Sequence, residues 1–412
     1  MRIALVIETF NPTSGGAERS TATIANHLIQ RGHEVTVLTG YCPEDLPTQP
    51  GLTVKTAMLG RPRGVLRLAT FVRWASRQLT EYDVSLSVTT SVPASVVQPR
   101  AGLVMQAQAR SVARRDTSLA RAAKRFAIAC STRQIALRLA ERRTMRDPFV
   151  QQFVAISQYV ARDMLRYYAI GDDRITIIPN ASEMPSVDAA QRAAWRREIR
   201  QSFNIPDDTV MYLFPAIDPW RKGILPLMRA AAQLKQRGVP FVIALAGSVS
   251  HTQQRLAEQM QLREQVRMVG RTEQMAALFC AADVTVLPTF HDPSSKVIIE
   301  SLMMGTPAIS SGYNGASDFI EPHDTAGSRR GRVVHEPDDV AGLCQAMTEL
   351  ADAAERERCA KATAGLAESL TMSRHVERLE PVLEAAAEQQ RKQSGHSAAA
   401  SVASSTESVE RG

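Results

Sequence analysis

Short apolar runs alternate with amphipathic stretches along most of the chain. The stretch 18–32 has the 3.6-residue period of a helix and ends at Gly32. Apolar runs without regular polar alternation predict strands buried on both faces, as in parallel sheets. In the first part of the chain such runs occupy residues 2–8, 34–40, 84–88 and 153–157.

The same pattern restarts after the sequence ITIIPN, near residue 170. The later predicted strands are 210–216, 241–247, 266–270, 284–288 and 307–310. Helical stretches separate them, one beginning at Lys222 and one containing Glu300. This order predicts an α/β protein whose parallel sheets are covered by helices on both faces. Two such runs in 412 residues predict two Rossmann-like domains, 1–169 and 170–371.

The segments around and after these domains have their own composition. An arginine-rich helical stretch is predicted from about 105 to 146, and further helices at 337–351, 353–369 and 372–388. The last 22 residues, 391–412, are rich in serine and alanine. Such low complexity predicts a disordered tail after a final helix at 372–390.

The net charge of +7 is unevenly distributed. Residues 99–166 contain fourteen arginines and lysines against four acidic residues, so the rest of the chain is slightly acidic. Such an asymmetry predicts a polyanionic partner, either nucleic acid or an anionic membrane surface. A solvated helix face without a partner is the alternative.

Other global features indicate a cytoplasmic protein. No apolar run reaches the roughly 18 residues of a membrane span, and residues 1–12 contain no signal-peptide pattern. The five cysteines include no C-x-x-C pair, which favours reduced thiols. H-E-x-x-H, D-x-D, Walker A and G-x-S-x-G motifs do not occur, so the sequence predicts no metal site and none of these catalytic classes.

Two loops that follow predicted strands have anion-binding chemistry. Gly15 and Gly16 precede a helix, whose first amides suit an anion, although a plain tight turn explains them equally well. Arg221 and Lys222 follow the strand at 210–216 and are candidates for holding a diphosphate. A solvated basic pair is the alternative for this second loop.

Two further strand ends complete the candidate site. Gly270 and Arg271 end the strand at 266–270 and are candidates for framing a nucleobase through backbone contacts. The stretch HDPSSKVIIESLMMG at 291–305 places Asp292 before a helix start and Glu300 inside an apolar helix. Glu300 could accept hydrogen bonds from a vicinal diol, while free amides at the helix start could bind a ligand. The alternative is that Asp292 or a neighbouring serine merely caps the helix.

In their order along the chain, these motifs resemble the retaining glycosyltransferases of GT-B fold that carry an E-x(7)-E motif, of the group 1 or family four type. The resemblance runs from residue 1 to about 390 and rests on GGAERS, FVAISQYVARDML…ITIIPNASE, WRKG and VLPTFHDPSSKVIIESLMMGTPAISSGYNGASDFI. Lipopolysaccharide-core glucosyltransferases are the most similar subgroup. The resemblance implies two Rossmann-like domains facing a central cleft and a helix at 372–390 that crosses back to the first domain.

The resemblance also assigns roles residue by residue. Glu300 matches the glutamate that holds the ribose, and Asp292 stands where the family has its first glutamate, which contacts the donor sugar. Lys222 matches the phosphate lysine, and Arg221 takes the place of an arginine that the family has several residues earlier. The remaining assignments are donor binding by Gly15, Gly16, Gly270, Arg271, Ser294, Ser295, Lys296 and Val297, and acceptor contacts by Glu18, Ser20 and Arg100.

The implied activity is transfer of a sugar, with retention and without a metal or cofactor, from a nucleotide sugar, with UDP as the implied nucleotide. The implied acceptor is a lipid-linked or lipopolysaccharide-type glycan at the inner face of the membrane, where the basic segment 99–166 would bind anionic lipid. Nucleic acid is disfavoured because the basic segment lacks interleaved aromatic residues.

Two departures from the family pattern leave alternatives open. Asp292 is one methylene shorter than the usual glutamate, and Ser295 stands where many members have glycine. A catalytically weak or inactive sugar-nucleotide or lipid-binding protein therefore remains possible, as does a sugar-nucleotide epimerase of the same fold. The sequence predicts no oligomeric state.

Overall fold

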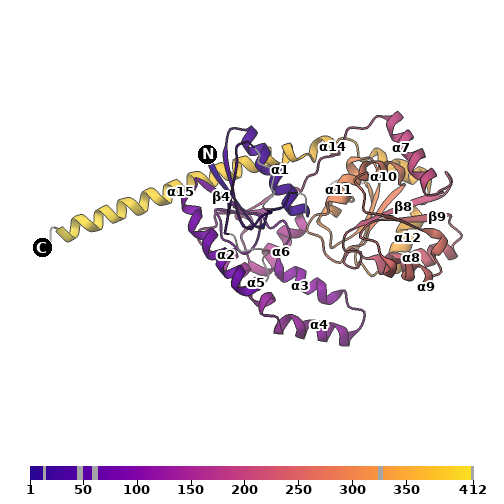
Figure 1. The fold of residues 1–412 in the computed structure, drawn as a ribbon, viewed down its shortest axis with the longest axis horizontal. Helices are drawn as coiled ribbons and strands as arrows, with labels where there is room; N and C mark the ends of the chain where they lie inside the picture. The colour runs from indigo at the N-terminus through magenta and orange to yellow at the C-terminus, as the bar shows by residue number, and fades with distance from the viewer. Residues whose placement is uncertain (13–14, 44–49, 58–63, 323–327, 410–412) are drawn as a thin grey trace.

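Two parallel sheets, one of seven strands and one of six, organise the chain. The structure is a computed structural model that describes residues 1–12, 15–43, 50–57, 64–322 and 328–409, with side chains up to residue 393. In Figure 1 the two sheets lie side by side with helices around them, and the C-terminal helix runs along the first half of the molecule. The predicted α/β fold of two Rossmann-like domains is confirmed.

The first sheet has the strand order β3-β2-β1-β4-β5-β6-β7, with every pair parallel. Its strands are β1 (Arg2–Thr9), β2 (Glu34–Tyr41), β3 (Leu52–Thr56), β4 (Val84–Ser87), β5 (Val96–Val97), β6 (Gln152–Ala155) and β7 (Ile175–Ile177). In β1, Ile3 and Leu5 pack into one apolar core while Ala4 and Val6 pack into another. Burial on both faces explains why this strand shows no polar alternation.

The α-helices between the strands of the first sheet lie in the first 168 residues of the chain. They are α1 (Gly16–Gln30), α2 (Val65–Gln78), α3 (Val104–Ala113), α4 (Ser118–Cys130), α5 (Thr132–Arg146) and α6 (Gln158–Tyr168). The single helical stretch predicted for 105–146 is thus three helices. The Thr117 hydroxyl accepts a hydrogen bond from the Ala120 amide, and the Ser131 hydroxyl accepts one from the Gln134 amide. These N-caps start new helices inside the stretch, a signal that the periodicity alone did not reveal.

The second sheet has the order β10-β9-β8-β11-β12-β13. Its strands are β8 (Val210–Ala216), β9 (Phe241–Gly247), β10 (Val266–Gly270), β11 (Val284–Leu287), β12 (Ala308–Ser311) and β13 (Gly331–Val334). Its helices are α7 (Ala189–Ser202), α8 (Ile224–Gln236), α9 (His251–Gln259), α10 (Met275–Ala281), α11 (Lys296–Met303), α12 (Val340–Glu349), α13 (Ala353–Lys361) and α14 (Leu366–Ser369). Short 3-10 helices lie at Leu79–Glu81, Asp172–Arg174, Arg263–Gln265 and Gly315–Phe319.

The first sheet extends beyond the domain boundary predicted at residue 169. Strand β7 pairs with β6, with Phe153 opposite Ile175, and so belongs to the first sheet. The strand follows a short 3-10 helix and consists of three β-branched residues, which pair with the edge of β6. The link between the two domains therefore begins after Ile177.

The last helix, α15 (Met372–Val409), returns to the first domain. Val376, Leu379 and Leu383 are buried in the same core as β1. Glu380 accepts hydrogen bonds from Arg31 at 2.5 Å and from His33 at 2.7 Å. The helix extends to Val409, into the segment 391–412 for which the sequence predicts a disordered tail, and residues 410–412 lie outside the described residues.

Candidate functional site

The loop between β8 and α8 carries Lys222 and places it beside the loop that follows β11. The Asp218 carboxylate accepts a hydrogen bond from the Arg221 amide at 3.2 Å, and the Asp218 carbonyl accepts one from the Lys222 amide at 3.0 Å. Gly223 has a φ of 88°, and a Cβ there would collide with the Pro288 carbonyl oxygen. This turn therefore requires glycine, and it holds Lys222 close to the loop that follows β11.

Lys222 and Asp292 form an ion pair between the carboxyl ends of β8 and β11. Their side chains are only 13% and 12% exposed. Burial alone would raise the pKa of Asp292, but the positive charges of Lys222 and Arg221 hold that pKa below its usual range. The two residues predicted as phosphate lysine and sugar-contacting acid are thus in direct contact, with Asp292 ionised.

The backbone fixes the loop that carries Asp292. The Asp292 amide donates to the Tyr313 carbonyl at 2.9 Å, and the Gly315 amide donates to the Asp292 carbonyl at 2.9 Å. Residue Ser295 is the N-cap of α11, but no side chain caps the helix. Neither Asp292 nor Ser294 acts as the cap, so the plain capping explanation fails. The Ser295 amide is already bonded to the Asn314 side chain at 3.1 Å, which corrects the expectation that it is a free donor.

Glu300 lies in α11 and meets the interdomain link. Its carboxylate accepts a hydrogen bond from the Ser182 hydroxyl at 2.6 Å. Lys296, one turn earlier, has a pKa lowered to about 8 by burial and by the charge of Arg100, an effect that Glu300 partly opposes. The half-buried carboxylate of Glu300 therefore has a polar partner, as expected for a charge in an otherwise apolar helix.

Arg100, predicted as an acceptor contact, lies beside the link between the two domains. It is 8% exposed and donates to the Gln98 side chain at 2.9 Å and the Asn180 side chain at 2.6 Å. Burial lowers the pKa of Arg100 to about 10. Asn180 in turn donates to the Ser294 carbonyl at 3.0 Å. Arg100 thus supports the loop next to Asp292 through Asn180.

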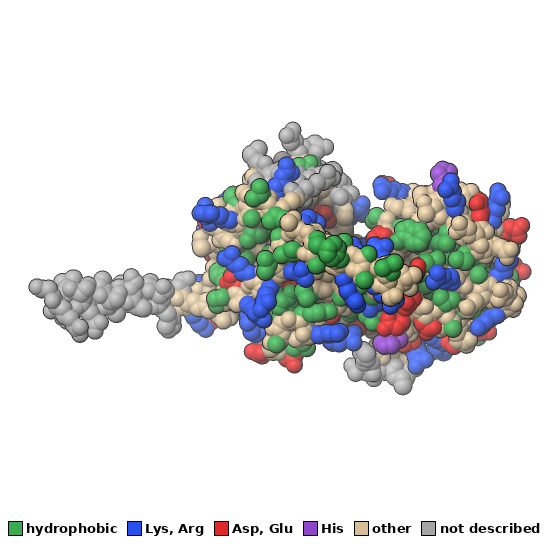
Figure 2. Space-filling view, turned by 90° about the horizontal axis from the view of Figure 1, so that it is seen from below, with side chains coloured by type: hydrophobic (Ala, Val, Ile, Leu, Met, Phe, Trp, Pro, Cys, Tyr) green, Lys and Arg blue, Asp and Glu red, His purple; other side chains and the backbone are tan. Residues whose placement is uncertain are grey.

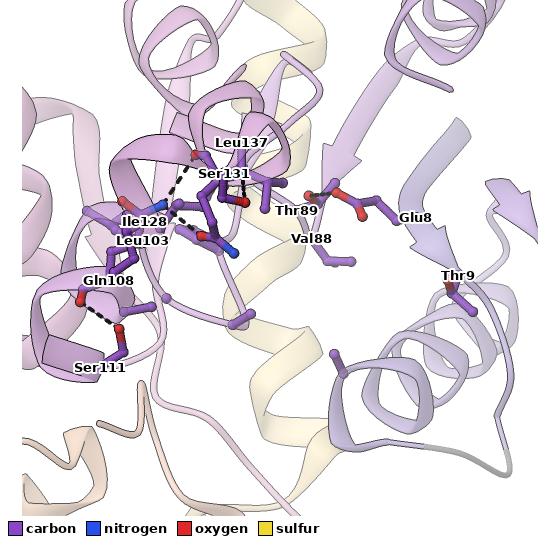
Figure 3. Close-up of a pocket in the computed structure, with 18 of the residues that line it drawn as sticks. Glu8, Thr9, Val88, Thr89, Leu103, Gln108, Ser111, Ile128, Ser131 and Leu137 are labelled. Atoms are coloured by element: carbon purple, nitrogen blue, oxygen red, sulfur yellow. Dashed lines mark hydrogen bonds between the residues drawn. The ribbon is translucent and has the colours of Figure 1, made fainter. Parts of the chain in front are cut away.

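A cavity of about 700 Å³ opens in the first domain, at the carboxyl ends of β1 and β4 (Figure 3). Glu18 from α1 lines it, and helices α3, α4 and α5 supply much of the opposite wall. Glu8, which the sequence analysis missed, also lines it and accepts hydrogen bonds from Ser91 at 2.8 Å and Thr89 at 3.3 Å. Ser20 does not reach the cavity, because it is buried and donates to the Gly16 carbonyl.

His291 is a second residue that the sequence analysis missed. The Tyr159 hydroxyl contacts His291 Nδ1 at 2.9 Å and accepts a hydrogen bond from the Gln106 amide group at 2.9 Å. When this hydroxyl donates to Nδ1, the neutral imidazole carries its single proton on Nε2. Burial lowers the pKa of His291 to about 4, so the ring is neutral at pH 7.

Nε2 of His291 is buried and has no hydrogen-bond partner among the described residues, and the same holds for the Ser294 hydroxyl. An ideal Cβ at Gly102, a residue that lines the cavity, would lie 3.4 Å from Nε2. Two unmatched polar groups thus flank Asp292 near the cavity, and burying them without a partner is unfavourable. No sequence pattern could reveal the pairing of His291 with Tyr159, which lies 132 residues away.

Sequence profiles of two known families match the two halves of the chain. The profile described as Glycosyl transferases group 1 matches residues 196–365, and that of Glycosyltransferase Family 4 matches residues 14–182. The chain belongs to these glycosyltransferases. The family predicted from the GGAERS, WRKG and HDPSSKVIIE motifs is therefore confirmed.

Individual glycosyltransferases are similar over most of the chain. An uncharacterized glycosyltransferase of Methanocaldococcus jannaschii is 24% identical over 343 residues, which cover 79% of this chain and 84% of the relative. The lipopolysaccharide glucosyltransferase WaaG of Escherichia coli is 24% identical over 327 residues, covering 78% of this chain and 82% of WaaG.

Solved glycosyltransferase structures share the fold. The crystal structure of WaaG, described as involved in lipopolysaccharide biosynthesis, has a TM-score of 0.72 at 19% identity and covers 92% of this chain and 99% of its own. The structure of Anabaena HepE in complex with UDP-glucose has a TM-score of 0.66 at 17% identity, covering 93% of this chain and 100% of HepE. These structures confirm the GT-B arrangement.

The remaining predicted donor residues lie at the ends of other strands of this glycosyltransferase. Gly15 has a φ of 45° and lies close to the Glu18 side chain, and Gly16 begins α1. Gly270 ends β10 with a φ of 78°. Among the described residues no hydrogen bond or ion pair joins the Arg271 side chain to the loop of Asp292. The structure brings Lys222 and Asp292 into contact, with Ser294 in the same loop as Asp292 and Glu300 in the helix that follows, while Gly270 and Arg271 lie at the end of the edge strand β10.

Proposed function

We propose that this protein is a retaining glycosyltransferase that moves a sugar from a UDP-sugar to a lipid-linked or lipopolysaccharide-type glycan. The observation that carries the proposal is the buried Lys222–Asp292 pair, with Glu300 in the helix that follows. HepE in complex with UDP-glucose supports the choice of donor, and WaaG, a lipopolysaccharide glucosyltransferase, supports the class of acceptor.

Donor binding would exchange partners within this site. The diphosphate of the donor would replace Asp292 as the partner of Lys222. The diphosphate and the Asp292 carboxylate are both anions and compete for the same ammonium group. The ribose hydroxyls would replace the Ser182 hydroxyl as the hydrogen-bond donors to the Glu300 carboxylate. The freed Asp292 would then face the sugar, with the Nε2 proton of His291 and the Ser294 hydroxyl available for sugar hydroxyl groups.

Transfer in this proposal needs no metal. Negative charge develops on the diphosphate as the bond to the sugar breaks, and Lys222, Arg221 and the N-terminus of α11 would stabilise that charge. The acceptor would enter from the cavity in the first domain. There Glu8, fixed by two hydroxyl groups, could accept a hydrogen bond from a glycan hydroxyl.

Nucleotide release from a panel of nucleotide sugars, with and without a membrane lipid extract, tests this function. We expect release of UDP that depends on the extract and is fastest for one UDP-sugar. Conversion of the donor to its epimer without release would favour the epimerase. Tight UDP-sugar binding with neither reaction would favour an inactive binding protein.

The basic region of the first domain is proposed to lie on an anionic membrane. Helix α4 exposes Leu119 (80%) and Phe126 (71%), seven residues apart and so on one face, beside basic residues such as Arg125. Figure 2 shows Lys and Arg side chains among hydrophobic ones on the face turned to the viewer. A helix with this mixture suits the interface of a bilayer. Among the described residues, no helix is long and apolar enough to cross a membrane.

Flotation with vesicles tests the membrane proposal. The protein should float with phosphatidylglycerol-rich vesicles and not with neutral ones, because each basic residue near the surface contributes about 1 kcal/mol. Replacing Leu119 and Phe126 by serine should reduce flotation, whereas Leu66→Ser, at an exposed leucine of α2, should not. Equal flotation with neutral vesicles, or none with either, would contradict the proposal.

A further inference from the structure

A second, smaller cavity lies between α5 and α6, separate from the donor site and from the acceptor-side cavity. Its volume is about 380 Å³, within the range of small-ligand pockets. Three of its lining residues are Arg138, Arg142 and Arg146, which follow one another every four residues along α5. Successive guanidinium groups are thus on one face of the helix, with a rise of about 6 Å from each to the next.

These arginines lack anionic partners. Among the described residues none of the three makes an ion pair or a side-chain hydrogen bond, and no carboxylate lines the cavity. The one acidic residue of α5, Glu141, is fully buried and accepts hydrogen bonds from the amides of Val104 and Met105 and from Tyr168. Like charges four residues apart destabilise a helix, so this row is unfavourable unless an anion binds to it.

The rest of the wall suits the organic part of an ester. The rings of Tyr167 and Tyr168 line the cavity, while their hydroxyls are engaged by Gln106 at 2.7 Å and Glu141 at 2.6 Å. Ile135 and Leu139 add apolar surface next to the arginines. Guanidinium groups pair with phosphate through two parallel hydrogen bonds, which a row of three such groups allows.

We propose that this cavity binds a phosphate ester, with the phosphate on the arginine row and the organic group against the apolar and tyrosine wall. The ester belongs either to a lipid headgroup or to a phosphorylated soluble or glycan group. In both cases the same three arginines recognise it. The site does not depend on the transfer reaction, so it stands or fails independently of the proposed function.

Calorimetry with glycerol 3-phosphate and flotation with phosphatidic acid vesicles test the site on the full chain at physiological salt. The triple replacement of Arg138, Arg142 and Arg146 by glutamine is compared with a control of equal charge. The control replaces Arg133, Arg143 and Arg162, three exposed arginines of α5 and α6 that do not line the cavity. We expect the cavity triple to weaken glycerol 3-phosphate binding at least about tenfold and the control to leave that binding nearly unchanged. Flotation, to which the whole basic segment contributes, should fall in both triples but further in the cavity triple.

The outcomes separate the sources and the alternatives. Binding of both probes, lost in the cavity triple, assigns the site to phosphate esters in general, while loss confined to vesicles assigns it to a lipid phosphate. Equal losses in both triples, or no binding of either probe, would overturn the proposal. If the cavity triple unfolds, as thermal unfolding would show, replacement of the same three residues by lysine keeps the charge. That variant should still bind more weakly than the wild type, because lysine cannot form the paired hydrogen bonds.

Discussion

Replacing Glu300 by glutamine is expected to weaken the binding of UDP and of every UDP-sugar to a similar degree. A hydrogen bond to a charged group contributes roughly 1.5–3 kcal/mol, so the affinity should fall about 10- to 150-fold. The loss should be uniform because the ribose is common to all these ligands. The glutamine carbonyl can still accept the hydrogen bond from Ser182, so the folded protein should change little.

Calorimetric titration with UDP measures this effect directly. Ser182→Ala is the matched control, because it removes the present partner of Glu300 without touching the carboxylate. We expect Ser182→Ala to bind UDP as well as the wild type or slightly better, since the ribose no longer competes with the serine. If Glu300→Gln binds UDP as the wild type does, Glu300 is not the ribose acceptor and the buried carboxylate has only a structural role.

Replacing Asp292 by alanine should lower turnover without weakening UDP binding. Turnover is expected to fall at least about 100-fold, the lower end of what one positioned catalytic group contributes. UDP binding should be unchanged or tighter, because the variant leaves Lys222 free for the diphosphate. Removing one partner of a buried ion pair is destabilising, so thermal unfolding should occur at lower temperature and UDP should restore part of the loss.

A donor-panel rate assay together with UDP calorimetry checks both parts of this expectation. Asp292→Glu restores the acid that the family usually has, and it should be tolerated or should change which sugar is preferred. Wild-type turnover in Asp292→Ala would remove Asp292 from the catalytic site. A large loss of UDP affinity in the same variant would show that Asp292 acts by shaping the phosphate site rather than through the sugar.

The sequence predicted the fold and the centre of the site because both depend on local patterns. Lys222 follows β8 and Asp292 follows β11, and in a parallel sheet the carboxyl ends of neighbouring strands lie at one edge. Position after a strand was therefore enough to place the two together. The pattern did not reveal their direct ion pair, since periodicity carries no information about side-chain contacts.

Contacts between the two domains were beyond the sequence. Ser182 meets Glu300 across 118 residues, and Tyr159 meets His291 across 132. Such pairs depend on how the two sheets face each other, which no window of sequence records. The same holds for Arg100. The resemblance assigns it to the acceptor side, while in the structure its guanidinium group donates to the Asn180 side chain in the link.

Errors at boundaries have a local origin. Strand β7 has only three residues, and it joins the first sheet by pairing with the edge of β6. The first sheet therefore extends past residue 169, which a pattern along the chain does not show. Ser20 does not line the cavity, because inside α1 its hydroxyl bonds the carbonyl four residues earlier. In the basic region the charge was correctly counted, while the division into α3, α4 and α5 depended on the caps at Thr117 and Ser131.

The central claim is that the site around Asp292 transfers a sugar with retention, and NMR analysis of the product tests it most directly. The protein is incubated with an α-linked UDP-sugar labelled at the anomeric carbon and with the lipid extract. A retaining transfer yields a new lipid-linked glycan that carries the labelled sugar in the α configuration, and Asp292→Ala should yield no such product. A β-linked product, or no labelled glycan with any UDP-sugar of the panel, would contradict the claim.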